Sequence, residues 1–210
     1  MPLAPHGEPL RTASTYTVFM AVEIELKFPV DDLPALQTRL LALGFHLDTP
    51  RTFESNTLYD TPDRTLLTGK QLLRIRQYGD TWLLTHKLQP SEFTPADIRY
   101  KRRIETETTV ADGEALAIIF ASLGYTPVFR YEKFRAEWSD PTHGGHLVLD
   151  ETPIGVYAEL EGEPNWIDAT LQRLGIPAAS CTTESYGKLF LAWKARTRSD
   201  AEHLTFAAIK

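Results

Sequence analysis

Residues 21–28 read AVEIELKF, and the alternation in this stretch decides the fold. Its three charged residues, Glu23, Glu25 and Lys27, are separated by apolar ones. Successive side chains of a β-strand point to opposite faces, so this segment predicts a strand with one ionic and one apolar face. The question is which face meets water, because half-buried strands normally turn their polar face outward.

The same two-residue spacing of like charges recurs along the chain. Arg74 and Arg76 stand two apart, as do the carboxylate pairs at 105/107 and 159/161. A single charged triplet is typical of an exposed edge strand, but recurrence on four separate strands favours a shared ionic surface. Alternation and turn residues together predict strands at 21–28, 51–60, 71–79, 81–88, 97–108, 128–138, 146–151 and 155–162. About eight strands are enough for a small closed barrel.

Helical segments punctuate these strands. Apolar spacing predicts helices over 31–45, 111–125, 163–176 and 183–196, with Asp112 as a capping residue and Gly44 and Gly124 as stops. Such helices would cover the apolar faces of the strands from outside and leave the ionic faces to line the interior. We therefore predict an α+β fold: an eight-stranded antiparallel β-barrel with helices packed on its outside.

An interior of this kind favours a metal and a polyanion. Carboxylates at 23, 25, 159 and 161 would repel one another without a cation, and hard oxygen ligands suit Mg²⁺ or Mn²⁺. A basic set that includes Lys27, Arg74, Arg76 and Lys87 suits several phosphoryl groups. The two sets together predict a site for a metal–polyphosphate complex.

Composition limits the number of domains and the kinds of partner that the protein could have. The chain has 210 residues, 42% hydrophobic and 24% charged, which fits one globular domain. Its net charge of −6 gives no reason to expect a nucleic-acid partner. Cys181 is the only cysteine, which excludes an internal disulfide. No apolar stretch is long enough to cross a bilayer, so we expect no membrane partner and a cytoplasmic location.

The sequence leaves the oligomeric state open between a monomer and a homodimer. We expect a flexible extension over 1–19, the domain over 20–196 and a tail over 197–210.

Seven motifs follow one another along the chain: VEIELKF, NTLYDTPDRTLLTGKQLLRIRQ, WLLTHK, RRIETE, EKFRAEW, LVLDETPIGVYAELEG and ESYGKLF. In this order they resemble the CYTH family, the triphosphate tunnel metalloenzymes. That family includes class IV adenylyl cyclases, thiamine triphosphatases and bacterial inorganic triphosphatases. The resemblance covers roughly residues 20–195. It implies a tunnel-like barrel whose interior is the active site.

The resemblance also implies roles for individual residues. The implied metal ligands are Glu23, Glu25, Asp150, Glu159 and Glu161, which with Lys27 form the implied catalytic set. The implied triphosphate-binding residues are Lys27, Arg74, Arg76, Lys87, Lys133, Arg135 and Lys188. Glu105 and Glu107 either bind a second metal or hold the arginines in place, and the sequence does not choose between these roles.

Three functions follow as hypotheses. The first is a metal-dependent triphosphatase that hydrolyses the terminal phosphate. Inorganic tripolyphosphate is its favoured substrate, because no base pocket is evident, with thiamine triphosphate and nucleoside triphosphates as alternatives. The second is a class IV adenylyl cyclase that converts ATP to cyclic AMP and pyrophosphate. The third is a non-catalytic binder of polyphosphate or nucleotide, which would gain nothing from carboxylates facing its ligand.

Some residues are expected to lie outside the site. The segment 88–97 is predicted to be a mobile loop, and the neighbouring Arg99 and Lys101 are expected to be solvated. Tyr186 fits a core position and a place at the site equally well.

Overall fold

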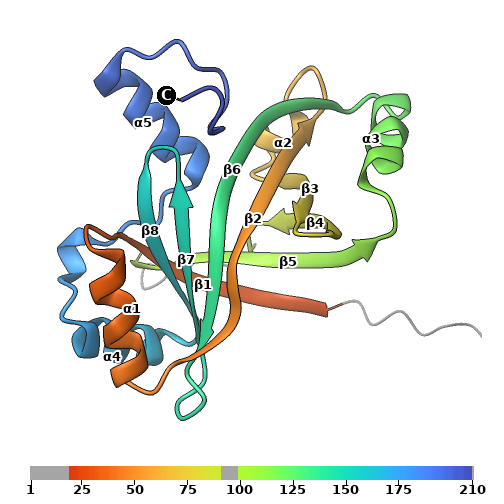
Figure 1. The fold of residues 1–210 in the computed structure, drawn as a ribbon. Coiled ribbons are helices and arrows are strands. Elements are labelled where there is room, and N and C mark those ends of the chain that lie inside the picture. The colour runs from red at the N-terminus through yellow and green to blue at the C-terminus, as the bar shows by residue number, and fades with distance from the viewer. Residues whose placement is uncertain (1–18, 91–98, 210) are drawn as a thin grey trace, which may run out of the picture.

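The computed structural model describes residues 19–90 and 99–209 (Figure 1). The predicted N-terminal extension, apart from its last residue, and most of the predicted mobile loop at 88–97 lie outside these ranges. The described strands close into an antiparallel barrel in the order β1-β5-β4-β3-β2-β6-β7-β8. The fold class predicted from the sequence is therefore confirmed.

The strands lie close to their predicted positions. They are β1 (Phe19–Pro29), β2 (His46–Asp60), β3 (Leu72–Tyr78), β4 (Thr81–Leu88), β5 (Lys101–Val110), β6 (Thr126–Ser139), β7 (His146–Thr152) and β8 (Gly155–Glu161). β2 begins five residues earlier than the predicted 51, because its first residues pair with the end of β6, His46 opposite Ser139. These residues show no alternation, so only the pairing reveals them as strand.

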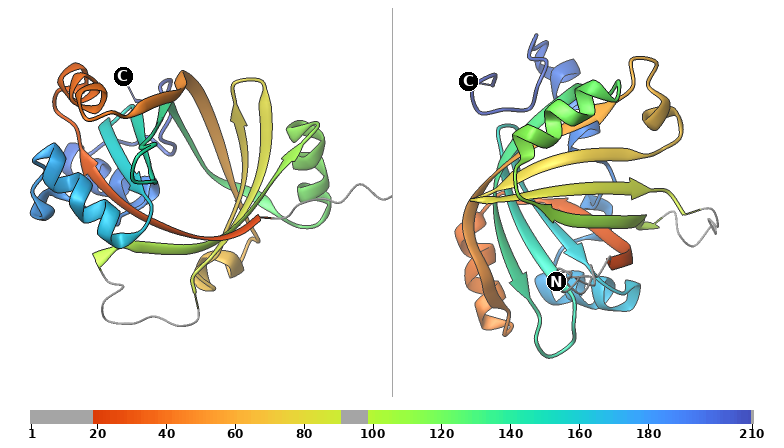
Figure 2. Two further views of the ribbon diagram at one scale, coloured as in Figure 1. Left: turned by 90° about the horizontal axis from the view of Figure 1, so that it is seen from below. Right: turned by 90° about the vertical axis from the view of Figure 1, so that its right-hand side faces the viewer.

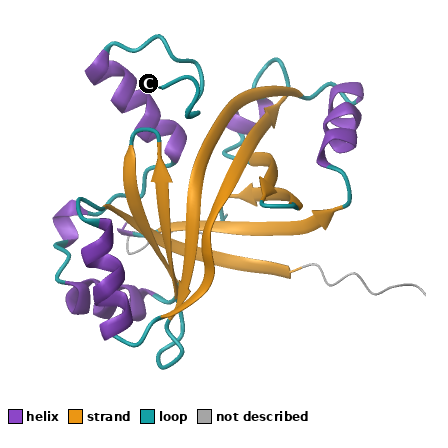
Figure 3. Cartoon of the chain, viewed as in Figure 1, coloured by secondary structure: helices purple, strands orange, loops and turns teal. Residues whose placement is uncertain are grey.

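The helices lie outside the sheet (Figure 3). They are α1 (Leu33–Ala42), α2 (Thr65–Thr68), α3 (Gly113–Ser122), α4 (Pro164–Leu174), the short 3₁₀ helix η2 (Ala178–Ser180) and α5 (Tyr186–Thr197). Asp112 caps α3 by accepting hydrogen bonds from two backbone N–H groups, and Gly124 follows with a φ of 87° that favours glycine. The four-residue α2 was not predicted. The Thr61 hydroxyl accepts a hydrogen bond from its first N–H group, that of Thr65, and the Asp60 carboxylate accepts from those of Leu66 and Leu67.

The apolar faces of the strands point outward, against these helices. Leu26 and Phe28 of β1 are buried in one cluster with Leu40 of α1 and Ile167 of α4. A fully buried side chain of this size contributes about 1.5–3 kcal/mol. α3 covers the opposite side of the barrel through its own smaller cluster, and Figure 2 shows the helices on the two flanks. The orientation on which the functional hypothesis depends, ionic faces inward, is the one observed.

The chain beyond α5 returns to the barrel. Leu204 is fully buried, its N–H donates to the carbonyl of Arg130, and its own carbonyl accepts from the N–H of Glu132. Tyr186 and Phe190 of α5 join the same apolar cluster. The first turn of α5 is thereby fixed against the barrel wall. None of the described helices has the length and apolar character needed to span a bilayer.

Candidate active site

The barrel encloses a charged cavity of about 550 Å³. All of the sequence-predicted site residues line it except Asp150 and Lys188. Those that line it are Glu23, Glu25, Lys27, Arg74, Arg76, Lys87, Glu105, Glu107, Lys133, Arg135, Glu159 and Glu161. Residues from β1, β3, β4, β5, β6 and β8 therefore converge on one space, although they lie far apart in the sequence.

Three carboxylates form an acidic cluster on one wall. One oxygen each of Glu23, Glu25 and Glu161 lies within 4.8 Å of the others, and Glu25 stands directly opposite Glu161 across the β1–β8 pair. Burial and repulsion from Glu23 raise the pKa of Glu161 to about 8. Three converging hard oxygen donors, with a repulsion that a cation would relieve, could hold a divalent metal ion.

We expect Glu161 to make the stability of the metal-free protein depend on pH. Its carboxyl group ionises near pH 8 when folded, against an ordinary value of 4.5. The folded state thus binds more protons between these values, so stability falls as pH rises through this window. We expect the melting temperature, followed by circular dichroism without metal, to drop by about 5 °C between pH 5 and pH 8.5. A Glu161→Gln variant should lose this component, and an equal drop in both proteins would contradict the assignment.

Glu159 belongs to a different group from its neighbour Glu161. It forms ion pairs with Lys27 and, at 2.8 Å, with Arg135. Burial raises the pKa of this carboxyl group, but the two cations and Lys133 outweigh burial and hold it well below its usual range. Its oxygens are already bound by cations, so the resemblance-based role as metal ligand fits Glu159 less well than Glu161.

Asp150 lies behind the cavity wall and holds the β6 cations. It is fully buried, and its oxygens accept hydrogen bonds from Lys133 at 2.8 Å and from Arg135 at 2.7 Å. The hydroxyl of Tyr186 donates a further bond at 2.7 Å. The resemblance implied a metal ligand here, but the polar contacts given for this carboxylate are with two cations and a tyrosine hydroxyl. Its geometry fits the positioning of phosphate-binding groups.

The cations of β3 and β4 are held in the same manner. Arg74 donates to the Tyr131 hydroxyl and to Thr85, both at 3.0 Å, and its guanidinium lies 3.5 Å from a Glu107 oxygen. Lys87 contacts Glu105 at 3.0 Å and also reaches Glu23 at 2.6 Å.

Glu105 and Glu107 therefore sit among cations. Neither joins the acidic cluster found among the described residues. Of the two roles left open by the sequence, the geometry favours holding the cations over binding a second metal.

Two lysines lie elsewhere than expected. Lys101 was expected to be solvated, but it lines the cavity and donates to Glu25 at 2.5 Å, because β5 pairs with β1 in a register that places the two opposite each other. Lys188 points away: its side chain is 70% exposed and pairs with Glu184 at 2.9 Å, although Tyr186 beside it lines the cavity.

An aromatic wall, Phe129, Tyr131 and Tyr186, adjoins the cations. The rings of Tyr131 and Tyr186 stack at 6.1 Å, those of Phe129 and Tyr131 at 6.0 Å. The Lys27 ammonium lies 4.4 Å from the Tyr186 ring centre. Tyr186 thus serves both the core and the cavity, and the apolar Leu58 lines the cavity too. Sequence reasoning missed this wall because its members come from β6 and α5.

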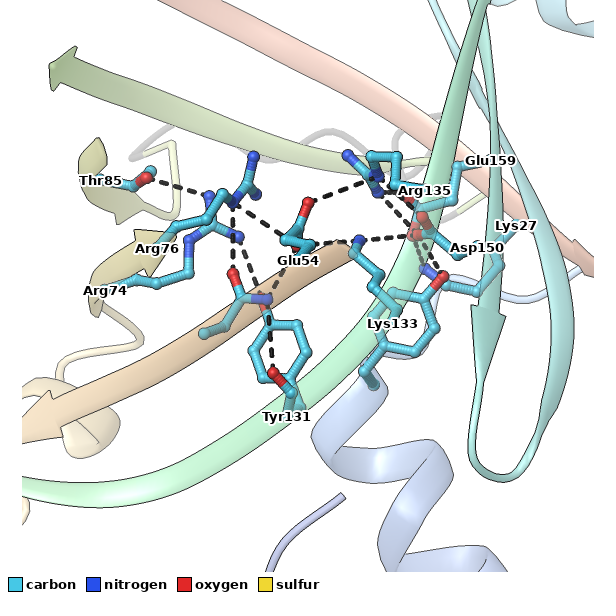
Figure 4. Close-up of polar contacts among 12 residues, drawn as sticks. Lys27, Glu54, Arg74, Arg76, Thr85, Tyr131, Lys133, Arg135, Asp150 and Glu159 are labelled. Carbon is cyan, nitrogen blue, oxygen red and sulfur yellow. Dashed lines mark hydrogen bonds and ion pairs between the residues drawn. The ribbon is translucent and has the colours of Figure 1, made fainter. Parts of the chain in front are cut away.

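Glu54 was also missed. It is fully buried between the two groups of cations (Figure 4). The alternation within the predicted strand 51–60 could have identified it, because Glu54 lies two positions before Asn56 and therefore on the same inner face.

The sequence matches a protein-family model and a related protein. The CYTH domain family model matches residues 21–172. A "putative adenylate cyclase" of Methanocaldococcus jannaschii is 26% identical over 140 residues, which cover 67% of this chain and 76% of that protein.

Two solved structures share the fold. One is an X-ray structure of a "putative adenylate cyclase" from Vibrio parahaemolyticus, with a TM-score of 0.67, 19% identity and coverage of 82% of this chain and 99% of that one. The other is a "putative adenylyl cyclase" from Hippeastrum, reported to reveal a dominant triphosphatase activity, with a TM-score of 0.59, 22% identity and coverage of 82% and 95%. At these identities the similarity supports the fold alone.

Proposed function

Since the chain belongs to the CYTH domain family, we propose that it is a metal-dependent triphosphatase that hydrolyses the terminal phosphate of a triphosphate inside its barrel, with inorganic tripolyphosphate as the favoured substrate. One observation carries the proposal: an acidic cluster that fits a divalent cation lines the same cavity as a large set of cations. A site built only to bind anions would not place three carboxylates against its ligand.

The cations of the cavity bind and orient the phosphate chain. Guanidinium groups such as those of Arg76 and Arg135 match phosphate oxygens in bidentate geometry, and Lys27 adds a point charge. Held by acidic side chains behind them, these groups are oriented before substrate arrives and neutralise charge as the terminal P–O bond loosens. Bound by Glu23, Glu25 and Glu161, Mg²⁺ or Mn²⁺ would supply further positive charge to the same phosphoryl group.

The attacking water is best placed beside the acidic cluster. A carboxylate oxygen there accepts a hydrogen bond from the water and turns its lone pair toward the terminal phosphorus. Water then displaces the rest of the phosphate chain, and orthophosphate and pyrophosphate leave. No serine or cysteine nucleophile is required.

The aromatic wall supports a second candidate, an adenylyl cyclase. Leu58, Phe129 and Tyr131 give the cavity an apolar side on which a nucleobase could stack. In that reaction the ribose 3′ hydroxyl attacks the α phosphorus of ATP and releases pyrophosphate. We rank it second because the cations and carboxylates dominate the cavity lining.

A substrate panel separates these functions. We expect the purified protein to release orthophosphate from tripolyphosphate with Mg²⁺ or Mn²⁺, at least about tenfold faster than it acts on ATP or thiamine triphosphate. Products should be separated by ion-exchange chromatography. Cyclic AMP with pyrophosphate from ATP would instead establish the cyclase, and binding of tripolyphosphate without turnover under either metal would leave a non-catalytic binder.

A further inference from the structure

The buried carboxylate of Glu54 lies between two groups of cations that the proposed function assigns to the phosphate chain. It sits on β2 directly opposite Lys133 of β6, and Figure 4 shows it between the β3 arginines on one side and the β6 cations on the other. Its oxygens lie 3.6 Å from Arg76, 3.4 Å from Lys133 and 3.8 Å from Arg135. Among the ion pairs of the described residues, Glu54 alone joins β3 to β6.

These contacts are longer than the hydrogen bonds that the same cations donate to other groups. Asp150 holds Lys133 and Arg135 at 2.7–2.8 Å. One Glu54 oxygen, Oε2, has no hydrogen-bond partner, and the other accepts a bond from Asn56 at 2.8 Å. The β6 cations are therefore positioned mainly by Asp150. What Glu54 adds is a negative charge, one side chain away from the phosphate site.

A fixed anion at this place competes with the substrate. The interior screens charges far less than bulk water does, so the Glu54 carboxylate cancels part of the positive potential that attracts phosphate. It also reduces repulsion among the three cations around it. We propose that Glu54 acts through these cations as a fixed counter-charge, which lowers the repulsion among them and limits how tightly they hold a polyphosphate. This inference rests on the proposed function, because it assumes that the cations bind phosphate.

The test is the affinity for tripolyphosphate, measured by isothermal titration calorimetry on the metal-free protein, where turnover does not interfere. Glu54→Gln should bind about tenfold more tightly than the unchanged protein, since a unit charge a few ångströms away at an effective dielectric constant of about 20 changes binding by at least that factor. In the metal-loaded enzyme, KM should fall while kcat does not rise. If Glu54 had only a structural role, the Glu54→Gln substitution would weaken binding instead.

Two further variants separate charge from shape. Glu54→Asp keeps the charge and should bind within about twofold of the unchanged protein. Glu151→Gln makes the same charge change on the outside of the barrel, where Glu151 pairs with Arg51, and should leave affinity unchanged. Equal or weaker binding by a folded Glu54→Gln protein would overturn the inference.

If Glu54→Gln does not fold, the same substitution can be tested in a protein that already carries Lys133→Gln. Lys133→Gln loses one cation, and adding Glu54→Gln to it restores the local net charge. The double variant should bind tripolyphosphate at least about fivefold more tightly than Lys133→Gln alone; equal binding would overturn the inference. If the unchanged protein does not bind tripolyphosphate at all, the proposed function fails as well, which distinguishes the two failures.

Discussion

Glu161→Gln is expected to abolish metal-dependent phosphate release while leaving the metal-free protein more stable than before. Glu161 lies within 4.8 Å of Glu23 and Glu25, and no cation among the described ion pairs compensates it. Removing its charge relieves that repulsion, so the melting temperature should rise by about 2–5 °C at pH 8.5. Loss of a metal ligand should lower orthophosphate release from tripolyphosphate at least about 100-fold.

The two readouts together make this prediction specific. Both are measured on one preparation, thermal unfolding without metal and phosphate release with saturating Mg²⁺ or Mn²⁺. A variant with unchanged activity would remove Glu161 from the proposed metal site. A variant that lost activity together with stability would mean that the carboxylate supports the barrel, contrary to the repulsion we infer. Glu151→Gln, an exterior change of the same kind, is the matched control.

Asp150→Asn is expected to have the opposite effect on stability. The Asp150 carboxylate is fully buried and bound by Lys133, Arg135 and the hydroxyl of Tyr186. Neutralising it leaves two buried cations without their main counter-charge, and breaking a buried pair from one side costs about 3–5 kcal/mol. We expect the free energy of unfolding, from urea titration followed by circular dichroism, to fall by about that amount.

Neighbouring positions on β7 provide the control for this second prediction. Glu151 stands next to Asp150 but points outward, where it pairs with Arg51. An exposed ion pair contributes about 0–1 kcal/mol, so Glu151→Gln should change the free energy of unfolding by no more than that. A comparably small change in Asp150→Asn would show that Lys133 and Arg135 find other partners, and would contradict the role given to Asp150.

Asp150 and Glu161 illustrate two uses of acidic residues in one barrel. Asp150, Glu159 and Glu107 are placed among cations and hold them. Glu161 lies beside Glu23 and Glu25 in a cluster that a divalent ion would complete, and among the described ion pairs it alone of the three has no cation. Substitution to the neutral amide costs stability in the first use and relieves repulsion in the second. Activity alone would not distinguish them, since both kinds of change are expected to impair turnover.

Much of this architecture could be predicted from local pattern. The period of two in VEIELKF and in the strand with Arg74 and Arg76 identifies strands and the face each charge occupies, since a strand allows no other placement. Capping by Asp112 and termination at Gly124 mark a helix for the same local reason. A resemblance based on seven ordered motifs then led to the family.

Partners inside the barrel could not be predicted in this way. Alternation places Lys101 and Glu54 on a face without indicating what stands opposite, so the first was expected to be solvated and the second was overlooked. β1 lies between β5 and β8, and β2 beside β6, strands that are distant in the sequence.

The sequence by itself thus determined that a barrel forms, which faces of its strands are ionic, and which residue types reach the interior. Only the tertiary structure decided that Asp150 and Glu159 are bound by cations, that Glu161 but not Glu159 joins the acidic cluster, and that Lys188 turns to solvent. The physical reason is that a side chain's face depends on its own backbone. Its electrostatic partner depends on strand order and register, which are fixed only when the sheet closes.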